Sequence, residues 1–160
     1  MLIVPSWILK YDTLDLSPHN SLVRYLVECG HAVFTISWKK PREEARDAGL
    51  NDYLQLGLFD ALVQVRRIAG AAPIRATGNC LGGTLLAIGA AALGRHSQRH
   101  PVSLATMTLF AAQTDFSEPA EPGLFIGSAR LLIWMRWWQS KAIWKALRWR
   151  APSSCSIRAI

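Results

Sequence analysis

Short apolar runs alternate with stretches of helical periodicity along the first 126 residues. Runs rich in β-branched or aromatic residues predict four strands, at 2–5, 32–37, 74–77 and 103–110. Between them, apolar residues recur at helical spacing and predict helices over 20–30, 52–69 and 81–93. We expect Asn20, Ser21 and Asp52 to cap the first two helices, and we expect loops over 6–19 and 39–49. This order predicts an α/β fold, a parallel sheet covered by helices.

Composition excludes several classes of protein. The chain has 160 residues, of which 51% are hydrophobic and 18% charged, so it is not expected to be disordered. It has no apolar run of the ~18 residues that a membrane-spanning helix needs, and its first residues do not resemble a signal peptide. Three widely spaced cysteines do not suggest a disulfide framework. We therefore expect a cytoplasmic protein without a metal.

The positive charge is confined to the end of the chain. The net charge is +7, and residues 127–160 contain seven basic residues, no acidic residue and five of the seven tryptophans. We therefore divide the chain into a body, 1–126, and a tail, 127–160. The body is neutral, so nucleic-acid binding is not expected of it, and the tail has the charge for such binding but no motif.

The candidate chemistry lies between the third predicted strand and the helix that follows. The segment 78–83 reads GNCLGG, which is G-x-C-x-G, the cysteine form of a nucleophile elbow. Gly78, Gly82 and Gly83 lack side chains where a sharp turn brings backbone together. Cys80 would stand at the apex, and the amide of Leu81 would face a developing oxyanion. The alternative is a small buried cysteine in a glycine-rich turn.

Several separated blocks around this motif resemble the polyhydroxyalkanoate synthases, most closely the single-gene, short-chain class I. They read VPSWILKY, LDLSPHNSLVRYLVECGHAVFTISWK, DYLQLG, TGNCLGGTLLAI and TLFAAQTDFSEP. The resemblance covers about 2–126 and implies a partial α/β-hydrolase core, truncated at both ends. It also implies polymerisation of (R)-3-hydroxyacyl-coenzyme A into polyester, without a cofactor. Asn79 departs from the family pattern, which has an aromatic residue there.

The resemblance assigns roles to individual positions. It implies that Cys80 holds the growing chain as a thioester and that the Leu81 amide is one oxyanion donor. A second donor would be an amide of the loop after the first strand, at Trp7 or Ile8. Asp15 matches a carboxylate near the family's active site, without a role that we can assign.

A base for the thiol is missing from the expected position. A cysteine nucleophile needs a general base oriented by a carboxylate, and in this family both lie far downstream of the cysteine. After Cys80 the only histidines are His96 and His100, at the end of the helix that leaves the elbow. Asp115 comes too early for the family's acid. His19 and His31 are expected in a loop and at a strand start.

The tail matches nothing in the family and permits two interpretations. One is a basic, Trp-rich amphipathic helix on an anionic membrane or granule surface. The other, which we favour, is a reading-frame error after Ile126. Trp and Met each have a single codon, so Trp134-Met135 and Trp137-Trp138 partly fix the neighbouring frame, which decodes to an acidic, helix-forming, synthase-like sequence. We accordingly expect the tail to be poorly ordered.

Four functions are compatible with these features. The first is a truncated synthase that is inactive alone, with hydroxyacyl-coenzyme A as the family substrate, a polyester granule as partner and a homodimer as the family assembly. The second is a non-enzymatic module that binds intact synthase subunits or the granule surface. The third is a small cysteine hydrolase of the same fold, and the fourth is nucleic-acid binding through the tail.

Overall fold

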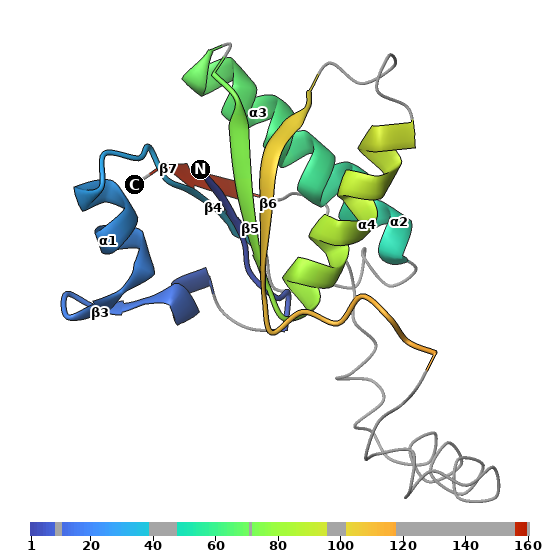
Figure 1. The fold of residues 1–160 in the computed structure, drawn as a ribbon, viewed down its shortest axis with the longest axis horizontal. Helices are drawn as coiled ribbons and strands as arrows, with labels where there is room; N and C mark the ends of the chain where they lie inside the picture. Colours follow the sequence, from blue (N-terminus) through green and yellow to red (C-terminus); the bar gives the residue numbers. More distant parts are fainter. Residues whose placement is uncertain (9–10, 39–47, 71, 96–101, 118–155, 160) are drawn as a thin grey trace, which may run out of the picture.

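The computed structural model describes residues 1–8, 11–38, 48–70, 72–95, 102–117 and 156–159. They form a five-stranded sheet in the order β6-β5-β1-β4-β7, with helices on both faces (Figure 1). The strands are β1 (Leu2–Val4), β4 (Phe34–Ser37), β5 (Ile74–Asn79), β6 (Leu104–Phe110) and β7 (Ser156–Ala159). Four strands are parallel, and β7 is antiparallel to β4. The predicted α/β fold is therefore confirmed.

Helices cover the two faces of the sheet unequally. The helical elements are α1 (Leu22–Glu28), α2 (Leu50–Asp52), the π-helix η3 (Tyr53–Phe59), α3 (Asp60–Ala69) and α4 (Leu81–Arg95). α3 and α4 lie on one face, and α1 lies on the other (Figure 1). The single helix expected over 52–69 is thus three consecutive pieces, with a π-helical turn in the middle.

The alternation of β1 builds a separate apolar core on each face. Leu2 and Val4 belong to the larger core, which includes buried residues of η3, α3 and α4. Ile3 belongs to the smaller core with Val23 of α1 and Val33. Because successive strand residues face opposite sides, one short strand contributes to both cores. β1 pairs with β5 on one side and with β4 on the other, both in parallel, so it lies in the centre of the sheet.

The segment 6–19, expected to be a loop, contains ordered structure in its second half. A 3₁₀ turn, η1 (Tyr11–Leu14), leads into β2 (Asp15–Ser17), which pairs with β3 (Asn20–Ser21). Asn20 therefore lies in a strand, and the prediction that it caps the helix is wrong. Ser21 does cap α1, since its Oγ accepts a hydrogen bond from the amide of Arg24 at 2.8 Å.

The second helical stretch also begins differently from the prediction. Gly49 is the N-cap of α2, and the Gly49 amide donates to Asp52 Oδ2 at 2.7 Å. Asp52 is therefore three residues inside the helix, where a carboxylate can reach back to the cap amide. The predicted capping role of Asp52 is wrong in position, although its side chain does satisfy the start of the helix.

Part of the tail belongs to the sheet. Ser156–Ala159 form β7, which pairs with all four residues of β4. The rest of the segment 127–160, for which we expect poor order, lies outside the described residues. Within the part of the chain that the structure describes, no helix is long and apolar enough to cross a membrane.

Candidate active site

Cys80 occupies the turn between β5 and α4 in a left-handed backbone conformation. Its φ is +52°, and among the described non-glycine residues only Ala111 shares a positive φ. A non-glycine residue in this region costs about 1–2 kcal/mol. Such strain at the junction of a strand and a helix is the geometry expected of a nucleophile elbow. The Cys80 side chain is a free thiol of intermediate exposure.

The glycines around Cys80 are sites of close backbone approach. A Cβ built on Gly78 would lie 2.4 Å from the Cα of Gly83, and one built on Gly82 would lie 2.2 Å from the carbonyl oxygen of Val4. No side chain fits at either position without moving backbone. Glycine therefore lets the first turn of α4 rest directly on the ends of β5 and β1.

The first turn of α4 has two amides without an acceptor. The carbonyl of Cys80 accepts from the amide of Gly83 at 2.9 Å and from that of Thr84 at 3.2 Å. Among the described residues, nothing accepts from the amides of Leu81 and Gly82. Amides at a helix N-terminus carry partial positive charge and can bind an anion. The structure thus places the Leu81 amide, the predicted oxyanion donor, beside Cys80.

The end of β6 is fastened to the same turn. The amide of Cys80 donates to the carbonyl of Phe110 at 2.9 Å. The hydroxyl of Thr84 donates to the carbonyl of Gln113 at 2.7 Å. Between these bonds lies Ala111, the other residue with positive φ. Two hydrogen bonds, one from Cys80 and one from Thr84, therefore hold the turn from the β6 side, and they lie on either side of Ala111.

On the other side lies the loop after β1, where the second oxyanion donor is predicted. Ser6 is fully buried, and its Oγ accepts from the amide of Ile8 at 3.4 Å. Among the described residues, the amide of Trp7 has no acceptor. The carbonyl of Pro5 accepts from Nε1 of Trp38 at 2.8 Å. The loop that carries Ile8 is therefore anchored by two side chains, those of Ser6 and Trp38.

An aromatic cluster of Trp7, Trp38 and Tyr53 packs beside this loop. The ring centroids are 4.9 Å apart for Trp7 and Tyr53, 5.6 Å for Trp38 and Tyr53, and 6.5 Å for the two tryptophans. Burial raises the pKa of Tyr53 above its ordinary value. The sequence pattern did not predict this cluster. The only signal for it in the sequence is that Trp7 and Trp38 each follow the end of a predicted strand, at 2–5 and 32–37, within three residues.

Among the described residues, the structure shows no contact between the remaining candidates and Cys80. Asp15 lies on the exposed β2–β3 hairpin, where its carboxylate accepts from the Ser21 hydroxyl at 2.5 Å. His31 lies three residues before β4, at the amino end of that strand, whereas Cys80 follows the carboxyl end of β5, and both strands are parallel to β1. His96 and His100 lie outside the described residues. Asp115 is exposed, and the amide of Ser117 donates to it at 2.9 Å, which lowers the pKa of this carboxyl.

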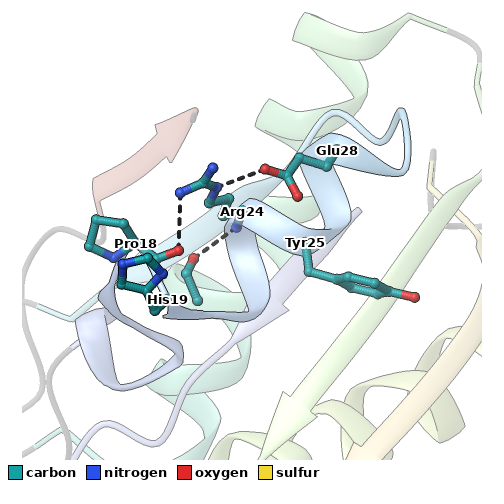
Figure 2. Close-up of a pocket in the computed structure, with 6 residues that line it drawn as sticks. Pro18, His19, Arg24, Tyr25 and Glu28 are labelled. Carbon is teal, nitrogen blue, oxygen red and sulfur yellow. Dashed lines mark hydrogen bonds and ion pairs between the residues drawn. The ribbon is translucent and has the colours of Figure 1, made fainter.

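A polar groove lies on the hairpin and α1, separate from the elbow (Figure 2). His19 lies at one end of it. Arg24 crosses it, with Nε donating to Glu28 at 2.7 Å and Nη1 donating to the carbonyl of Pro18 at 3.1 Å. Because Glu28 already neutralises Arg24, the groove offers no unpaired cation. Within the described ranges, no group of His, Cys, Asp and Glu is placed to hold a metal ion.

Comparison with known proteins finds relatives of one kind. Residues 1–26 match the family model described as the N-terminus of poly-beta-hydroxybutyrate polymerase (PhaC). The chain is 36% identical over 133 residues to the poly(3-hydroxyalkanoate) polymerase subunit PhaC of Cupriavidus necator, covering 83% of this chain and 22% of that protein. It is 34% identical over 131 residues to the corresponding subunit of Rhizobium etli, covering 82% and 20%.

A relative from Ectopseudomonas oleovorans, poly(3-hydroxyalkanoate) polymerase 2, is 32% identical over 155 residues. That alignment covers 85% of this chain and 28% of the relative. The chain thus spans between 20% and 28% of the length of these three relatives.

Proposed function

The chain belongs to the family of the poly(3-hydroxyalkanoate) polymerases, and on this basis we propose that Cys80 is the nucleophile of an acyl transfer. The observation that carries the proposal is the positive φ of Cys80 at a strand-to-helix turn. A strained backbone at that position has a cost, and a buried structural cysteine would gain nothing from it. The resemblance makes the acyl donor an (R)-3-hydroxyacyl-coenzyme A and the product a polyester.

The proposed step is a thioester exchange. Cys80 Sγ loses its proton to the buffer and bonds to the carbonyl carbon of the substrate, whose oxygen becomes an oxyanion. The amide of Leu81 donates to that oxyanion, together with an amide of the β1 loop, at Trp7 or Ile8. The oxyanion then collapses and the bond to the coenzyme A sulfur breaks. Coenzyme A leaves as a thiolate and takes a proton from the buffer, while the acyl group remains on Cys80 as a thioester.

We propose that the 160-residue chain does not polymerise its substrate alone. None of the described residues places an imidazole or a carboxylate against Cys80. Arg95, the last described residue of α4, is about 22 Å along the helix axis from the elbow, at 1.5 Å per residue. His96 and His100 follow it in the sequence. Because no described residue takes the proton of Cys80, its acylation is slow. Chain growth also needs a base to activate each incoming hydroxyl group, and we propose that it does not follow.

The test uses (R)-3-hydroxybutyryl-coenzyme A as substrate. We expect a single acyl group on Cys80, detected by peptide mass spectrometry, and no polymer. Cys80→Ala should abolish the acylation, whereas the matched control Cys29→Ala, at an exposed cysteine away from the elbow, should keep it. Acylation that survives Cys80→Ala would contradict the nucleophile. Polymer made by the parent chain and lost in Cys80→Ala would contradict the proposed inactivity.

A second candidate function is a non-catalytic module that binds a synthase subunit or a polymer granule. The edge strand β6 favours it, because Met107 and Phe110 on this strand are 42% and 44% exposed. No described strand pairs with the outer edge of β6. Co-sedimentation with granules that survives Cys80→Ala would support this function, and its loss on deletion of 127–160 would assign binding to the tail.

For the tail itself we propose a shifted reading frame after Ile126. The support is the absence of acidic residues from a segment with five tryptophans, in contrast to the neutral body. The nucleotide sequence tests it directly. Read one frame over after codon 126, it should continue as a synthase-like, acidic and helix-forming sequence. Stop codons or unrelated sequence in that frame would contradict the proposal.

A further inference from the structure

Three segments that are far apart in the sequence meet at the carbonyl of Pro5. This carbonyl accepts from Nε1 of Trp38, one residue past the end of β4, at 2.8 Å. The same oxygen lies so close to α4 that a Cβ built on Gly82 would be 2.5 Å from it. Pro5 itself directly follows β1. One carbonyl therefore joins the ends of β1 and β4 to the first turn after Cys80.

The indole of Trp38 is held on several sides. A Cβ built on Gly57 of the π-helix would lie 2.6 Å from Cζ3 of Trp38, so the ring rests against bare backbone. Tyr53 and Trp7 both pack edge to face against it, with interplanar angles of 61° and 82°. Aromatic contacts of this kind favour a fixed mutual orientation. The donor that Trp38 presents to Pro5 therefore has little freedom to swing away.

The Pro5 carbonyl and the Ser6 amide belong to one planar peptide unit. A hydrogen bond that fixes the carbonyl therefore also fixes the direction in which the chain continues toward Trp7 and Ile8. The amides of those two residues are the candidates for the second oxyanion donor. Ile8 is held further along by a bond of 3.4 Å to Ser6, which is long for an N–H donor. The Trp38 bond is therefore the shorter of the two anchors.

We propose that Trp38 is a positioning residue for acyl transfer, because its indole N–H aims the β1 loop amides at the carbonyl oxygen of the acyl group on Cys80. The proposal rests on the proposed function of Cys80. Trp38 does not touch the acyl group and acts through Pro5. Misplacing a donor by a fraction of an ångström weakens stabilisation of the oxyanion and leaves the thiol itself unchanged.

The test compares two reagents at Cys80 in the full chain. With p-nitrophenyl acetate, Sγ bonds to the acetyl carbon, p-nitrophenolate leaves and the thiol proton passes to buffer, through an oxyanion. With iodoacetamide, Sγ displaces iodide, the thiol proton again passes to buffer, and no oxyanion forms. The rates are measured by peptide mass spectrometry, with exposed Cys29 as the internal reference.

Trp38→Phe removes the N–H and keeps an aromatic ring. We expect acetylation of Cys80 to fall about 10-fold and alkylation to stay within about twofold, because only acetylation uses the oxyanion donors. The matched control is Tyr53→Phe, which changes the same cluster without touching the Pro5 bond and should alter neither rate. An equal fall with both reagents, or no fall with either, would overturn the proposal.

Failure of the proposed function has a different signature. If Cys80 of the parent chain is acetylated no faster than Cys29, Cys80 is not an activated acyl acceptor and the proposed function fails. The role of Trp38 in holding the β1 loop is then tested by hydrogen exchange. Amides of residues 6–8 should then exchange faster in Trp38→Phe than in Tyr53→Phe. Equal exchange in the two variants would overturn the role of Trp38 in holding the loop.

Discussion

The helices α1 and α4 begin in opposite ways. At α1, Ser21 has an extended backbone with φ −140°, and its side chain accepts from the amide of Arg24. At α4, Cys80 stands at the corresponding position with φ +52°. A cap side chain reaches the helix amides from an extended backbone, and the left-handed conformation of Cys80 excludes that arrangement.

The two helix starts differ in what their first amides can bind. The Ser21 side chain accepts a hydrogen bond from an α1 amide that has no partner within the helix. The Ser21 hydroxyl in turn donates to the carboxylate of Asp15 at 2.5 Å. At α4 the amides of Leu81 and Gly82 have no acceptor within the described residues, and a thiol stands next to them. A satisfied cap stabilises a fold, whereas an uncapped helix start beside a nucleophile can bind an anion that forms during a reaction.

The largest effect is expected from filling the contact between α4 and β1. Gly82→Ala places a Cβ 2.2 Å from the carbonyl oxygen of Val4, and neither backbone segment can move without disturbing the sheet. We expect the free energy of unfolding to fall by at least about 3 kcal/mol. The measurement is chemical denaturation of the full chain.

Gly94→Ala is the matched control for that prediction. Gly94 lies in the same helix, and nothing is within 4 Å of a Cβ built on it. Alanine there should raise the free energy of unfolding by about 0.5–1 kcal/mol, because it removes the entropic cost of a helical glycine. Similar gains in both variants would mean that helix propensity, and not backbone contact, governs this helix.

The next effect concerns the strain at Cys80. Cys80→Gly should be more stable than Cys80→Ala by about 1–2 kcal/mol, because glycine adopts a positive φ without a steric penalty. The same pair of substitutions at Ser21 provides the comparison. There both variants lose the cap, and glycine loses only a few tenths of a kcal/mol. Equal stability of the two Cys80 variants would show that this turn is not strained.

A smaller effect is expected at the cap of α1. Ser21→Ala should lower the free energy of unfolding by about 1 kcal/mol, because it removes the acceptor of the Arg24 amide. The rate of alkylation of Cys80 should not change, since the cap lies on the hairpin and α1. Denaturation and iodoacetamide labelling of one sample measure both quantities. A change in labelling would show that the two helix starts are coupled.

The smallest effect is in the pH dependence at Asp115. The Ser117 amide holds the pKa of this carboxyl below its ordinary value of 3.8. A lowered carboxyl pKa stabilises the folded chain above the unfolded pKa, and that contribution disappears as pH falls through the folded pKa. Ser117→Pro removes the donor and should return the Asp115 pKa toward 3.8 in an NMR titration. If the Asp115 pKa is the same in Ser117→Pro, the hydrogen bond from Ser117 is not what lowers it.

Local pattern predicted most of the sheet and the elbow. The strands β1, β4 and β5 lie within the predicted runs or within two residues of them, because buried parallel strands are short and apolar. The edge strand β6 also lies within its predicted run, although most of its residues are exposed. The segment 78–83 predicted a strand-to-helix turn because glycine at those spacings is informative by itself. The same local signals identified Ser21 as a cap and misassigned Asn20 and Asp52. These residue types are common at helix caps, but Asn20 pairs within the hairpin and Asp52 accepts from the amide of Gly49, the true cap residue.

Long-range contacts could not be predicted in the same way. The bond from Trp38 to Pro5 joins residues 33 positions apart, and the resting of the Trp38 ring on Gly57 depends on a π-helical turn that no periodicity indicated. The pairing of β7 with β4 depends on register across the whole chain. The roles of Cys80, Leu81, Ile8 and Asp15 in catalysis remain predictions.

The number of residues in the π-helix η3 determines how the side chains at its two ends are oriented relative to each other. Tyr53 at its start joins the aromatic cluster, while Leu58 and Phe59 at its end belong to the main core. Deleting one residue from the segment, such as exposed Gln55, would change the rotation of one end relative to the other. Either the ring would leave Trp38 or the core side chains would turn outward. Insertions and deletions should therefore be tolerated far less here than single substitutions of the exposed residues between.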